Sequence, residues 1–270
     1  MKKYQDIKDS ADFFAGYTND RDIRYNGSSG GIVSQVLIYL LEEKIIDGAL
    51  VTRLNKLIPE TFLAKTPEEI LSSQGSVYMP VPFFQGIRKI INENGKYAVV
   101  GIPCQLKFLQ KFPQVLDNIF LKIGLFCNHT PSYEGTKELI KEVGLNEKEI
   151  TYLKYRGLGR IGISVLKTKE KEVKKSFRDT WNILTSDKFY TENCKICEDH
   201  LNSLSDFACG DAWNKEYAND SLGTSLIIRY SQKAKEILDE MKNKNIISLE
   251  KIEFSKILQS QGYEIVNNNG

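Results

Sequence analysis

The stretch YAVVGIPCQLKFLQKF (residues 97–112) and the run IFLKIGLF that follows it (residues 119–126) decide the fold class. Tyr97–Val100 is apolar and ends at Gly101, as expected of a buried strand that leads into a tight turn. Cys104–Phe112 carries apolar residues at helical spacing, and residues 119–126 form a second apolar strand. Strand, turn, helix and strand in this order predict a βαβ unit in a mostly parallel sheet.

Upstream of this unit, the chain continues to alternate between helical and strand-like patterns. Thr66 is a candidate N-cap, because Pro67 follows it at the first helical position and Glu69 stands three residues after the cap. Helices are expected over Gly31–Glu43, Pro67–Leu71 and Phe83–Ile91, and a strand over Ile46–Val51.

Beyond residue 145 the pattern changes to short strands separated by glycines and charged residues. We therefore predict an α/β fold of mixed α+β character, with an N-terminal βαβ-type part (1–145) and a smaller, partly antiparallel part (146–270) that carries the CxxC loop. A single domain is the alternative, and the terminal NNNG is expected to be disordered. The second part should contain strands over Tyr152–Tyr155, Ile163–Leu166, Val173–Phe177 and Thr224–Tyr230, a loop-rich segment over Thr191–Asp211 and a helix over Lys233–Lys242.

Length and charge narrow the function classes. The chain has 270 residues, of which 37 are basic and 35 acidic, for a net charge of +2. This near balance argues against a nucleic-acid-binding protein that relies on a strong basic field. No run approaches the roughly 18 apolar residues that a membrane-spanning helix needs, and MKKYQDIKDSADFFAGY lacks the apolar region of a secretory signal. The sequence therefore predicts a cytoplasmic protein without a membrane span.

The motif NGSSGG, residues 26–31, stands directly before an apolar helix. Glycine permits close backbone approach, and the free N–H groups at a helix start, together with hydroxyls, can bind an anion. One interpretation is a phosphate cradle for a nucleotide such as FAD or FMN. The alternative is a flexible loop that caps the helix through Ser28 or Ser29. The motif is neither GxGxxG nor Walker A, so Rossmann-type binding does not follow from it.

The segment Gly101-Ile102-Pro103-Cys104 lies where a predicted strand passes into a helix. Pro103 suits the first helical turn. The unpaired N–H groups and the positive dipole end there are expected to lower the pKa of Cys104 and to favour its thiolate. Such a sulfur suits a metal ligand or a nucleophile, and the alternative is a buried free cysteine that packs as a small apolar residue.

Four further cysteines follow. Cys127 ends the second strand, Cys194 and Cys197 form a CxxC knuckle in a polar loop, and Cys209 lies beyond it. Two intervening residues allow two sulfurs to share one metal centre. Five scattered cysteines do not form a disulfide framework, and we expect Cys104, Cys127, Cys194 and Cys197 to form one four-thiolate set. Zinc, iron–sulfur, a thioredoxin-like dithiol and no cofactor remain open, because spacing alone does not choose among them.

Taken in order, these short motifs resemble those of the coenzyme F420 hydrogenase/dehydrogenase beta subunit family, which includes beta subunits of deazaflavin-reducing hydrogenases and formate dehydrogenases. The likeness covers roughly residues 14–213, about three quarters of the chain. Its motifs are NGSSGG (26–31), IIDGALV (45–51), GSVY (75–78), VVGIPCQL (99–106), IGLFC (123–127), CKIC (194–197) and GDAW (210–213).

The resemblance implies an FAD- and 4Fe–4S-dependent oxidoreductase that passes electrons from the cluster through the flavin to coenzyme F420. Hydride transfer between stacked rings requires no acid–base residue, so no catalytic residue is assigned, and His129 and His200 are interpreted as polar contacts. The resemblance points to Cys104, Cys127, Cys194 and Cys197 as cluster ligands. It implies cofactor contacts at Asn26, Ser28, Ser29, Gly30, Gly31, Gly75, Ser76, Tyr78 and Pro103.

Three departures from the family pattern matter. No cysteine precedes Cys104, so no N-terminal ferredoxin-like module is expected, and electrons should come from a partner subunit or a ferredoxin. Cys209 is either a spare thiol or an alternative ligand. The family also contains reductases with other acceptors, which keeps open a ferredoxin-dependent reductase with the same cofactors. A non-catalytic subunit shaped by zinc or by an inert cysteine set is a third interpretation, and an oligomer is possible.

Overall fold

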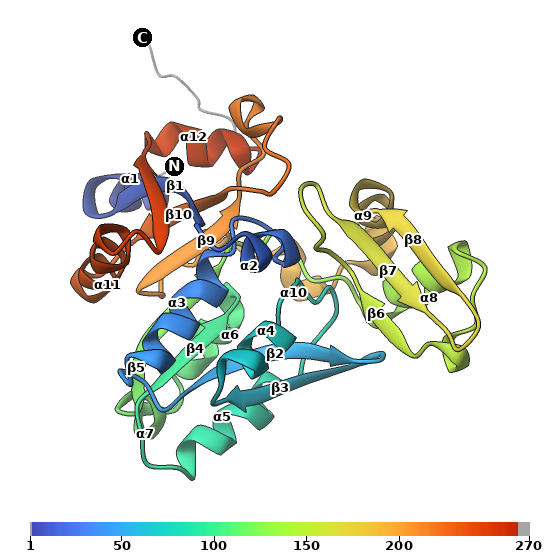
Figure 1. Ribbon diagram of the computed structural model, residues 1–270, viewed down its shortest axis with the longest axis horizontal. Coiled ribbons are helices and arrows are strands. Elements are labelled where there is room, and N and C mark those ends of the chain that lie inside the picture. Colours follow the sequence, from blue (N-terminus) through green and yellow to red (C-terminus); the bar gives the residue numbers. More distant parts are fainter. Residues whose placement is uncertain (1, 264–270) are drawn as a thin grey trace.

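The computed structural model describes residues 2–263, which form a large sheet flanked by helices and a smaller lobe beside it (Figure 1). The large sheet has eight strands in the order β11-β1-β10-β9-β5-β4-β2-β3, and the small sheet has three in the order β6-β7-β8. This arrangement confirms the mixed α/β prediction, including the smaller antiparallel part. The predicted disorder of NNNG concerns residues outside the described range.

Four adjacent strands form the parallel centre of the large sheet. Strand β4 pairs with β2 on one side and with β5 on the other, and β5 pairs with β9, each time in parallel. The βαβ unit predicted from residues 97–126 is therefore confirmed. The bounds are Gly48–Asn55 for β2, Tyr97–Gly101 for β4, Ile119–Leu125 for β5 and Phe207–Asp211 for β9.

The outer strands run antiparallel to their neighbours. Strand β10 pairs with β9, β1 with β10, β11 with β1, and β3 with β2. Two antiparallel steps bring β1 back to the direction of β9, so the carboxyl ends of β1, β4, β5 and β9 share one edge of the sheet. The bounds are Asp12–Thr18 for β1, Ile58–Ala64 for β3, Ser225–Arg229 for β10 and Ile247–Lys251 for β11.

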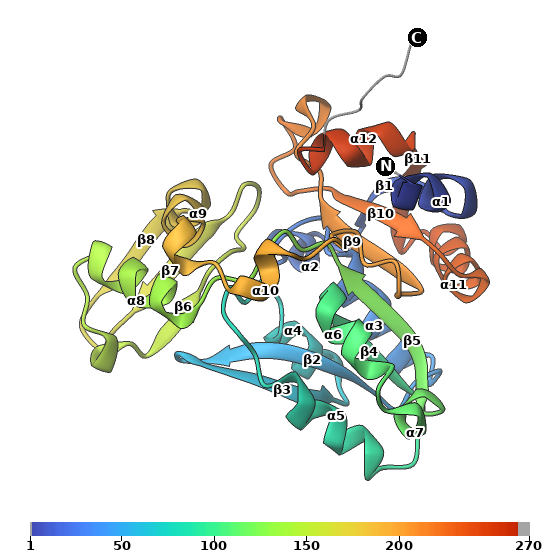
Figure 2. The ribbon, with the colours of Figure 1, turned by 180° about the vertical axis from the view of Figure 1, so that it is seen from behind.

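Helices cover both faces of the large sheet, because its strands are apolar on both sides. In β2, Ala49 and Val51 belong to the core under α3, whereas Leu50 belongs to the core under α5 and α6. Figure 2 shows the second face, with α5, α6 and α7 in front of the parallel strands. One face carries α3 (Ile32–Glu42), α4 (Pro67–Ser72) and α11 (Gln232–Asn243), and the other carries α1 (Lys2–Ser10), α5 (Phe83–Ile91), α6 (Pro103–Leu109), α7 (Pro113–Leu116) and α12 (Phe254–Ser260).

The predicted helix starts have the expected local contacts. The Thr66 hydroxyl accepts a hydrogen bond from the Glu69 N–H at 3.3 Å, which confirms this N-cap. Pro103 is the first residue of α6, and the Gln105 side chain accepts from the Ile102 N–H at 2.9 Å. Among residues 2–263, no helix combines the length and apolarity needed to cross a bilayer.

The small lobe is an antiparallel meander with two helices packed on it. Its strands β6 (Tyr152–Lys154), β7 (Ile163–Lys167) and β8 (Glu172–Ser176) pair in sequence order, as predicted. The strand expected to reach Phe177 ends at Ser176, because the Ser176 hydroxyl caps the next helix by accepting from the Asp179 N–H. The helices are α8 (Tyr133–Glu142) and α9 (Phe177–Leu184).

The small lobe is an excursion of the chain between two neighbouring strands. The chain leaves the large sheet after β5 and returns to it at β9, the strand beside β5. The segment Thr191–Asp211, expected to be a loop, contains the short helix α10 (Glu192–Lys195) and all of β9, so that expectation was wrong for residues 207–211. Strands β9–β11 thus join the N-terminal strands in one sheet, while the division into two domains at residue 145 stays a prediction.

Candidate functional site

The predicted site residues gather at the edge where the carboxyl ends of β1, β4, β5 and β9 lie. Helix α2 (Arg21–Asn26) and residues 27–31 follow β1, Cys104 follows β4, Cys127 follows β5, and Asp211 ends β9. Open α/β sheets bind their ligands outside the carboxyl ends of the parallel strands. The topology therefore brings segments far apart in sequence to the position where a ligand site is expected.

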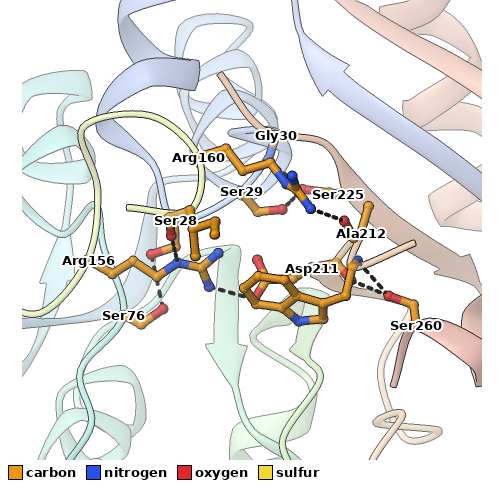
Figure 3. A network of polar contacts seen from close by, with 12 residues as sticks. Ser28, Ser29, Gly30, Ser76, Arg156, Arg160, Asp211, Ala212, Ser225 and Ser260 are labelled. Carbon is orange, nitrogen blue, oxygen red and sulfur yellow. Dashed lines mark hydrogen bonds and ion pairs between the residues drawn. The ribbon is translucent and has the colours of Figure 1, made fainter. Parts of the chain in front are cut away.

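The serine loop, defined as residues Ser28–Gly31, is held by hydroxyl contacts from two other segments (Figure 3). The Ser76 hydroxyl donates to the Ser28 hydroxyl at 3.0 Å. The Ser225 hydroxyl, on β10, accepts from the Gly30 N–H at 2.9 Å and donates to the Ser29 hydroxyl at 3.1 Å. The loop is thus placed by β10 and by the GSVY segment, which the motif pattern links to the same cofactor.

Glycine is required twice in the serine loop. A Cβ on Gly30 would lie 2.4 Å from the Gly16 carbonyl oxygen, because the loop packs directly on β1. Gly31 has a φ of +74° at the N-cap of α3, a conformation that glycine adopts without strain. The first N–H groups of α3 have no helical acceptor, so they remain available to an anion at this loop.

Basic side chains surround the serine loop. The Lys154 ammonium donates to the Asn26 carbonyl at 3.1 Å, and burial lowers the pKa of Lys154. Arg156, only 3% exposed, forms an ion pair with Asp211 at 2.5 Å (Figure 3). Its guanidinium carbon lies 4.5 Å from the Phe177 ring centroid and 5.1 Å from that of Trp213. Arg156 therefore ties the small lobe to the end of β9.

The remaining predicted cofactor contacts occupy different surroundings. Gly75 has a φ of +105°, and a Cβ there would lie 3.0 Å from the Arg156 carbonyl oxygen. Tyr78 packs into the small lobe, with its ring centroid 5.1 Å from that of Trp181, and burial raises the pKa of Tyr78. Pro103 is buried in the first turn of α6. Gly75 and Ser76 thus adjoin the serine loop region, whereas Tyr78 belongs to an aromatic cluster behind it.

The thiol cluster, defined as Cys104, Cys127, Cys194 and Cys197, brings together sulfurs from three segments. The side chain of Cys104 reaches the surface, but partial desolvation by the surrounding segments raises its pKa, and so do Cys194 and Cys197. Burial, followed by Cys104 and Cys194, raises the pKa of Cys127 to about 12. Hydrogen bonds join the three segments: the Cys127 N–H donates to the His200 carbonyl, and the Asn202 amide donates to the carbonyls of Gly101 and Leu125. The stretches that lead into Cys104 and Cys127 therefore lie beside the segment that follows the CxxC knuckle.

Two contacts to Cys194 and one from Cys197 orient these sulfurs. The Thr191 hydroxyl and the Thr130 N–H donate to the Cys194 sulfur at 3.0 and 3.4 Å, and the Cys197 thiol donates to the Asp199 carbonyl at 3.6 Å. All five cysteines are free thiols. Within residues 2–263, no three His, Cys, Asp or Glu side chains are arranged to hold a single metal ion.

Two expectations about individual cysteines are resolved by burial. The expected lowering of the Cys104 pKa was wrong, because burial and the neighbouring thiols outweigh the N–H groups of Cys104 and Gln105 that favour the thiolate. Cys209 lies in the core between the large sheet and α3, and burial alone raises its pKa. Cys209 is therefore a core residue on β9, apart from the thiol cluster.

The two histidines lie close to the thiol cluster but differ in their contacts. The Nδ1 atom of His200 lies 3.0 Å from the Cys127 carbonyl oxygen, to which it can donate a hydrogen bond. His129 is 5% exposed and stacks on Tyr190 with ring centroids 3.9 Å apart. The predicted role as a polar contact fits His200, whereas His129 is packed mainly through its ring faces.

Sequence reasoning missed Lys154 and Ser225 and did not pair Arg156 with Asp211. Lys154 and Arg156 lie at the end of a short strand of the small lobe, and Ser225 begins β10, so none of them belongs to a local motif. Their contacts join residues that are 55 to 196 positions apart in the sequence. Only Asp211 carried a signal, because it lies in the GDAW motif.

Comparisons with known proteins agree with the fold and the motif order. Two models of the coenzyme F420 hydrogenase/dehydrogenase beta subunit match, one for its N-terminal part over residues 13–88 and one for its C-terminal part over residues 94–254. The coenzyme F420 hydrogenase subunit beta of Methanothermobacter thermautotrophicus is 28% identical over 227 residues, which cover 78% of this chain and 77% of the relative.

Two further matches are a longer relative, of which this chain covers less than half, and a solved structure. A coenzyme F420-dependent sulfite reductase of Methanocaldococcus jannaschii is 28% identical over 272 residues, with 93% of this chain but 40% of the relative covered. A chain of the F420-reducing [NiFe] hydrogenase complex from Methanosarcina barkeri superposes with a TM-score of 0.70 at 20% identity, covering 94% of this chain and 90% of that one, and so shares its fold. Because the two family models together span most of its length, the chain belongs to the coenzyme F420 hydrogenase/dehydrogenase beta subunit family.

Proposed function

We propose that this protein is an oxidoreductase subunit that binds FAD at the serine loop and a 4Fe–4S cluster at the thiol cluster, and that it exchanges electrons with coenzyme F420. The observation that carries the proposal is the convergence of four thiols from three distant segments at the edge that also holds the serine loop. Relatives named as coenzyme F420 hydrogenase beta subunits support the F420-linked part.

The serine loop fits the phosphates of FAD. Its backbone is held against β1 and β10, so no reorganisation is needed before a phosphate meets the first N–H groups of α3. The Ser28 hydroxyl accepts from Ser76 and keeps its own proton for a phosphate oxygen, and Lys154 supplies a positive charge near this loop. The half-buried setting of Lys154 strengthens that charge toward an anion, because less water screens it.

The thiol cluster fits a cubane cluster through its donor set. Each of four sulfurs would bind one iron, and the contacts from Thr191 and Thr130 to Cys194 are of the kind that tune a cluster's potential. Burial, followed by the neighbouring thiols, raises the pKa of Cys104 and Cys127 and so disfavours their thiolates. Iron bound by these sulfurs would supply the positive charge that stabilises the thiolates, which is why a coordinating thiol loses its proton.

The chemistry then divides between the cofactors and the chain. When bound, the cluster supplies single electrons and the flavin converts them into hydride for the deazaflavin. The serine loop fixes the position of the flavin phosphates, and Arg156, paired with Asp211, holds the small lobe against the same edge of the sheet. The chain supplies no proton donor in this scheme, so its contribution is binding and orientation.

The deciding experiment is the ultraviolet–visible spectrum of anaerobically purified protein before and after dithionite, with iron and sulfide analysis. We expect a yellow-brown protein with about four iron and four sulfide per chain and a flavin band that bleaches on reduction. Folded, colourless protein that takes up no iron on reconstitution would overturn the proposal. Stoichiometric zinc without flavin would instead identify a non-catalytic subunit.

A different acceptor is the main competing function, since one relative is named for sulfite as well as for F420: it is a coenzyme F420-dependent sulfite reductase, of which this chain covers 40%. The test is to mix dithionite-free reduced protein with coenzyme F420 and follow the visible band of the deazaflavin. Loss of that band with matching reoxidation of the flavin supports F420 as the acceptor. Unchanged F420 in the presence of a reduced, flavin-loaded protein points to the same cofactors with a different acceptor.

A further inference from the structure

The outward side of α5 and α6 carries a partly exposed aromatic cluster. The Phe84 ring lies 6.0 Å from that of Phe108 and 5.4 Å from that of Phe112, and the last two are 5.0 Å apart. Phe84 is 40% exposed, although phenylalanine is usually buried. Three clustered aromatic rings at a surface are typical of a protein-binding site.

The same surface is basic in an otherwise balanced protein. Three exposed basic side chains, Arg88, Lys107 and Lys111, belong to it, whereas the whole chain is nearly balanced with 37 basic and 35 acidic residues. The guanidinium of Arg88 lies over the Phe84 ring at 5.9 Å from its centroid. Lys107 and Lys111 directly precede Phe108 and Phe112 in the sequence. Each of the three rings therefore has a basic residue on its own segment.

Helix α6 connects this surface to the thiol cluster. Pro103, Leu106 and Leu109 are buried against the sheet, whereas Cys104 and Lys107 are exposed. Residues three and four positions apart lie on the same side of a helix. Cys104, Lys107 and Phe108 thus share the outward side, within about 6 Å of rise along the helix.

We propose that this surface is the docking site of a small, acidic electron-carrier protein that exchanges electrons with the thiol cluster through the Cys104 side. The inference rests on the proposed function, since it requires a redox group at the thiols, and it specifies where and by what chemistry the partner is recognised. We name the surface the α5–α6 face; it consists of Phe84, Arg88, Lys107, Phe108, Lys111 and Phe112.

Charge decides which partner fits the α5–α6 face. A second copy of this chain, docked with twofold symmetry, would oppose the same basic residues to one another. An acidic protein instead gains attraction during encounter, and its apolar contact surface can cover the phenylalanine rings.

The test compares two triple variants of the full chain. The first, Arg88→Glu/Lys107→Glu/Lys111→Glu, reverses the charge of the α5–α6 face. The control, Lys148→Glu/Lys171→Glu/Lys242→Glu, makes the same change in net charge at exposed positions on other elements. The probe is an acidic 2[4Fe–4S] ferredoxin. Its Kd is measured by calorimetry at low and high salt, and its rate of electron delivery is measured beside that of dithionite.

We expect the first variant to bind the ferredoxin at least tenfold more weakly at low ionic strength, with the difference shrinking at high salt, and the control to bind like wild type. Ferredoxin-driven reduction should slow in parallel, while dithionite reduction stays unchanged. Equal affinity of the first variant and wild type would overturn the inference, as would equal weakening in both variants. An oligonucleotide of similar charge that binds the face as tightly would also overturn it.

Failure of the proposed function has a different signature. A protein without flavin and iron would take no electrons from either donor, and one with flavin but no iron would be reduced by dithionite only, yet in both cases the ferredoxin affinity would still report on the α5–α6 face. Phe84→Ala provides a second variant that alters no charge. It should weaken binding at high salt, where the charge reversal has little effect, because the apolar contact is not screened.

Discussion

The serine loop and the thiol cluster lie at the same edge of the large sheet but are built in opposite ways. The serine loop is satisfied by the protein itself, since its hydroxyls and the Gly30 N–H pair with Ser76, Ser225 and the backbone. In the thiol cluster, burial and then the neighbouring thiols raise the pKa of Cys104 and Cys127, so their charged forms are disfavoured. One site is therefore preformed by packing, whereas the other gains its main stabilisation only when a cation binds.

This difference predicts how each site fails. Damage to the serine loop should disturb the fold itself, because the loop is part of the packing between β1 and β10. Damage to the thiol cluster should abolish binding of the metal group and leave the apo fold largely intact, because the sulfurs make few contacts on which the sheet depends.

The largest effect is expected for Cys127→Ser. Loss of one ligand from four should prevent assembly of a complete cluster, so iron should fall from about four per chain to well below three. Cys209→Ala is the matched control, because Cys209 packs in the core and should retain full iron. Iron and sulfide analysis of anaerobically purified protein checks both variants. Full iron in Cys127→Ser would show that Cys127 is not a ligand of the iron–sulfur cluster.

Gly30→Ala tests the preformed site. The new Cβ would lie 2.4 Å from the Gly16 oxygen and 2.8 Å from the Ser225 nitrogen, so the loop must move away from two strands. We expect a loss of about 3 kcal/mol in the free energy of unfolding and at least tenfold weaker FAD binding. Gly144→Ala, where nothing lies within 4 Å, should cost about 1 kcal/mol through its positive φ alone.

Urea denaturation and flavin fluorescence titration measure these two quantities. A Gly30→Ala protein as stable as Gly144→Ala would show that the serine loop adjusts easily, and the contrast between the two sites would then disappear.

Arg156→Met tests the contact between the lobes. Removal of the guanidinium leaves Asp211 without its partner at a site where Arg156 is 3% exposed, and the free energy of unfolding should fall by about 2 kcal/mol. The double variant Arg156→Met/Asp211→Asn should recover about 1 kcal/mol of that loss. Urea denaturation of the wild type, Arg156→Met, Asp211→Asn and the double variant gives the coupling free energy between Arg156 and Asp211. Strict additivity would mean that the ion pair contributes nothing specific.

The smallest effect concerns pH. Burial raises the pKa of Cys209, so the folded protein keeps this thiol protonated when the unfolded chain has already lost the proton. The stabilisation is complete below the unfolded thiol pKa of about 8.5 and falls by about 1.4 kcal/mol per pH unit above it. Cys209→Ala should therefore unfold with a shallower pH dependence between about pH 8.5 and 10. If the free energy of unfolding fell equally steeply with pH in wild type and Cys209→Ala, the pH dependence would not come from Cys209.

Local patterns were sufficient for the parallel centre of the fold. The apolar run 97–100, the turn at Gly101 and the helix after Pro103 depend on neighbouring residues, and all three are present in the structure. Strand β9 was missed because FACGD is short and follows a polar segment. Its strand character comes from pairing with β5 and β10, which no local pattern encodes.

The site divides in the same way. The serine loop and the four cysteines could be selected as candidates from the sequence, because they stand at predicted strand ends, at a helix start and in a CxxC motif, and their cofactor roles stay predictions. The pairing of Arg156 with Asp211 and the hydroxyl of Ser225 could not, because their partners are brought together only by the completed sheet. The pKa of Cys104 was misjudged because burial by other segments is invisible to a local argument.

The route of the chain between β5 and β9 has a mechanical consequence. The excursion that builds the small lobe starts beside Cys127 and returns beside Cys194, with 66 residues between them. A group bound by both sulfurs would act as a clip that closes this loop, restricting the unfolded chain by an entropy worth about 4 kcal/mol. Oxidative loss of that group would then lower the free energy of unfolding without changing the folded lobe, so protein that has lost it should be cleaved faster by proteases than protein that keeps it.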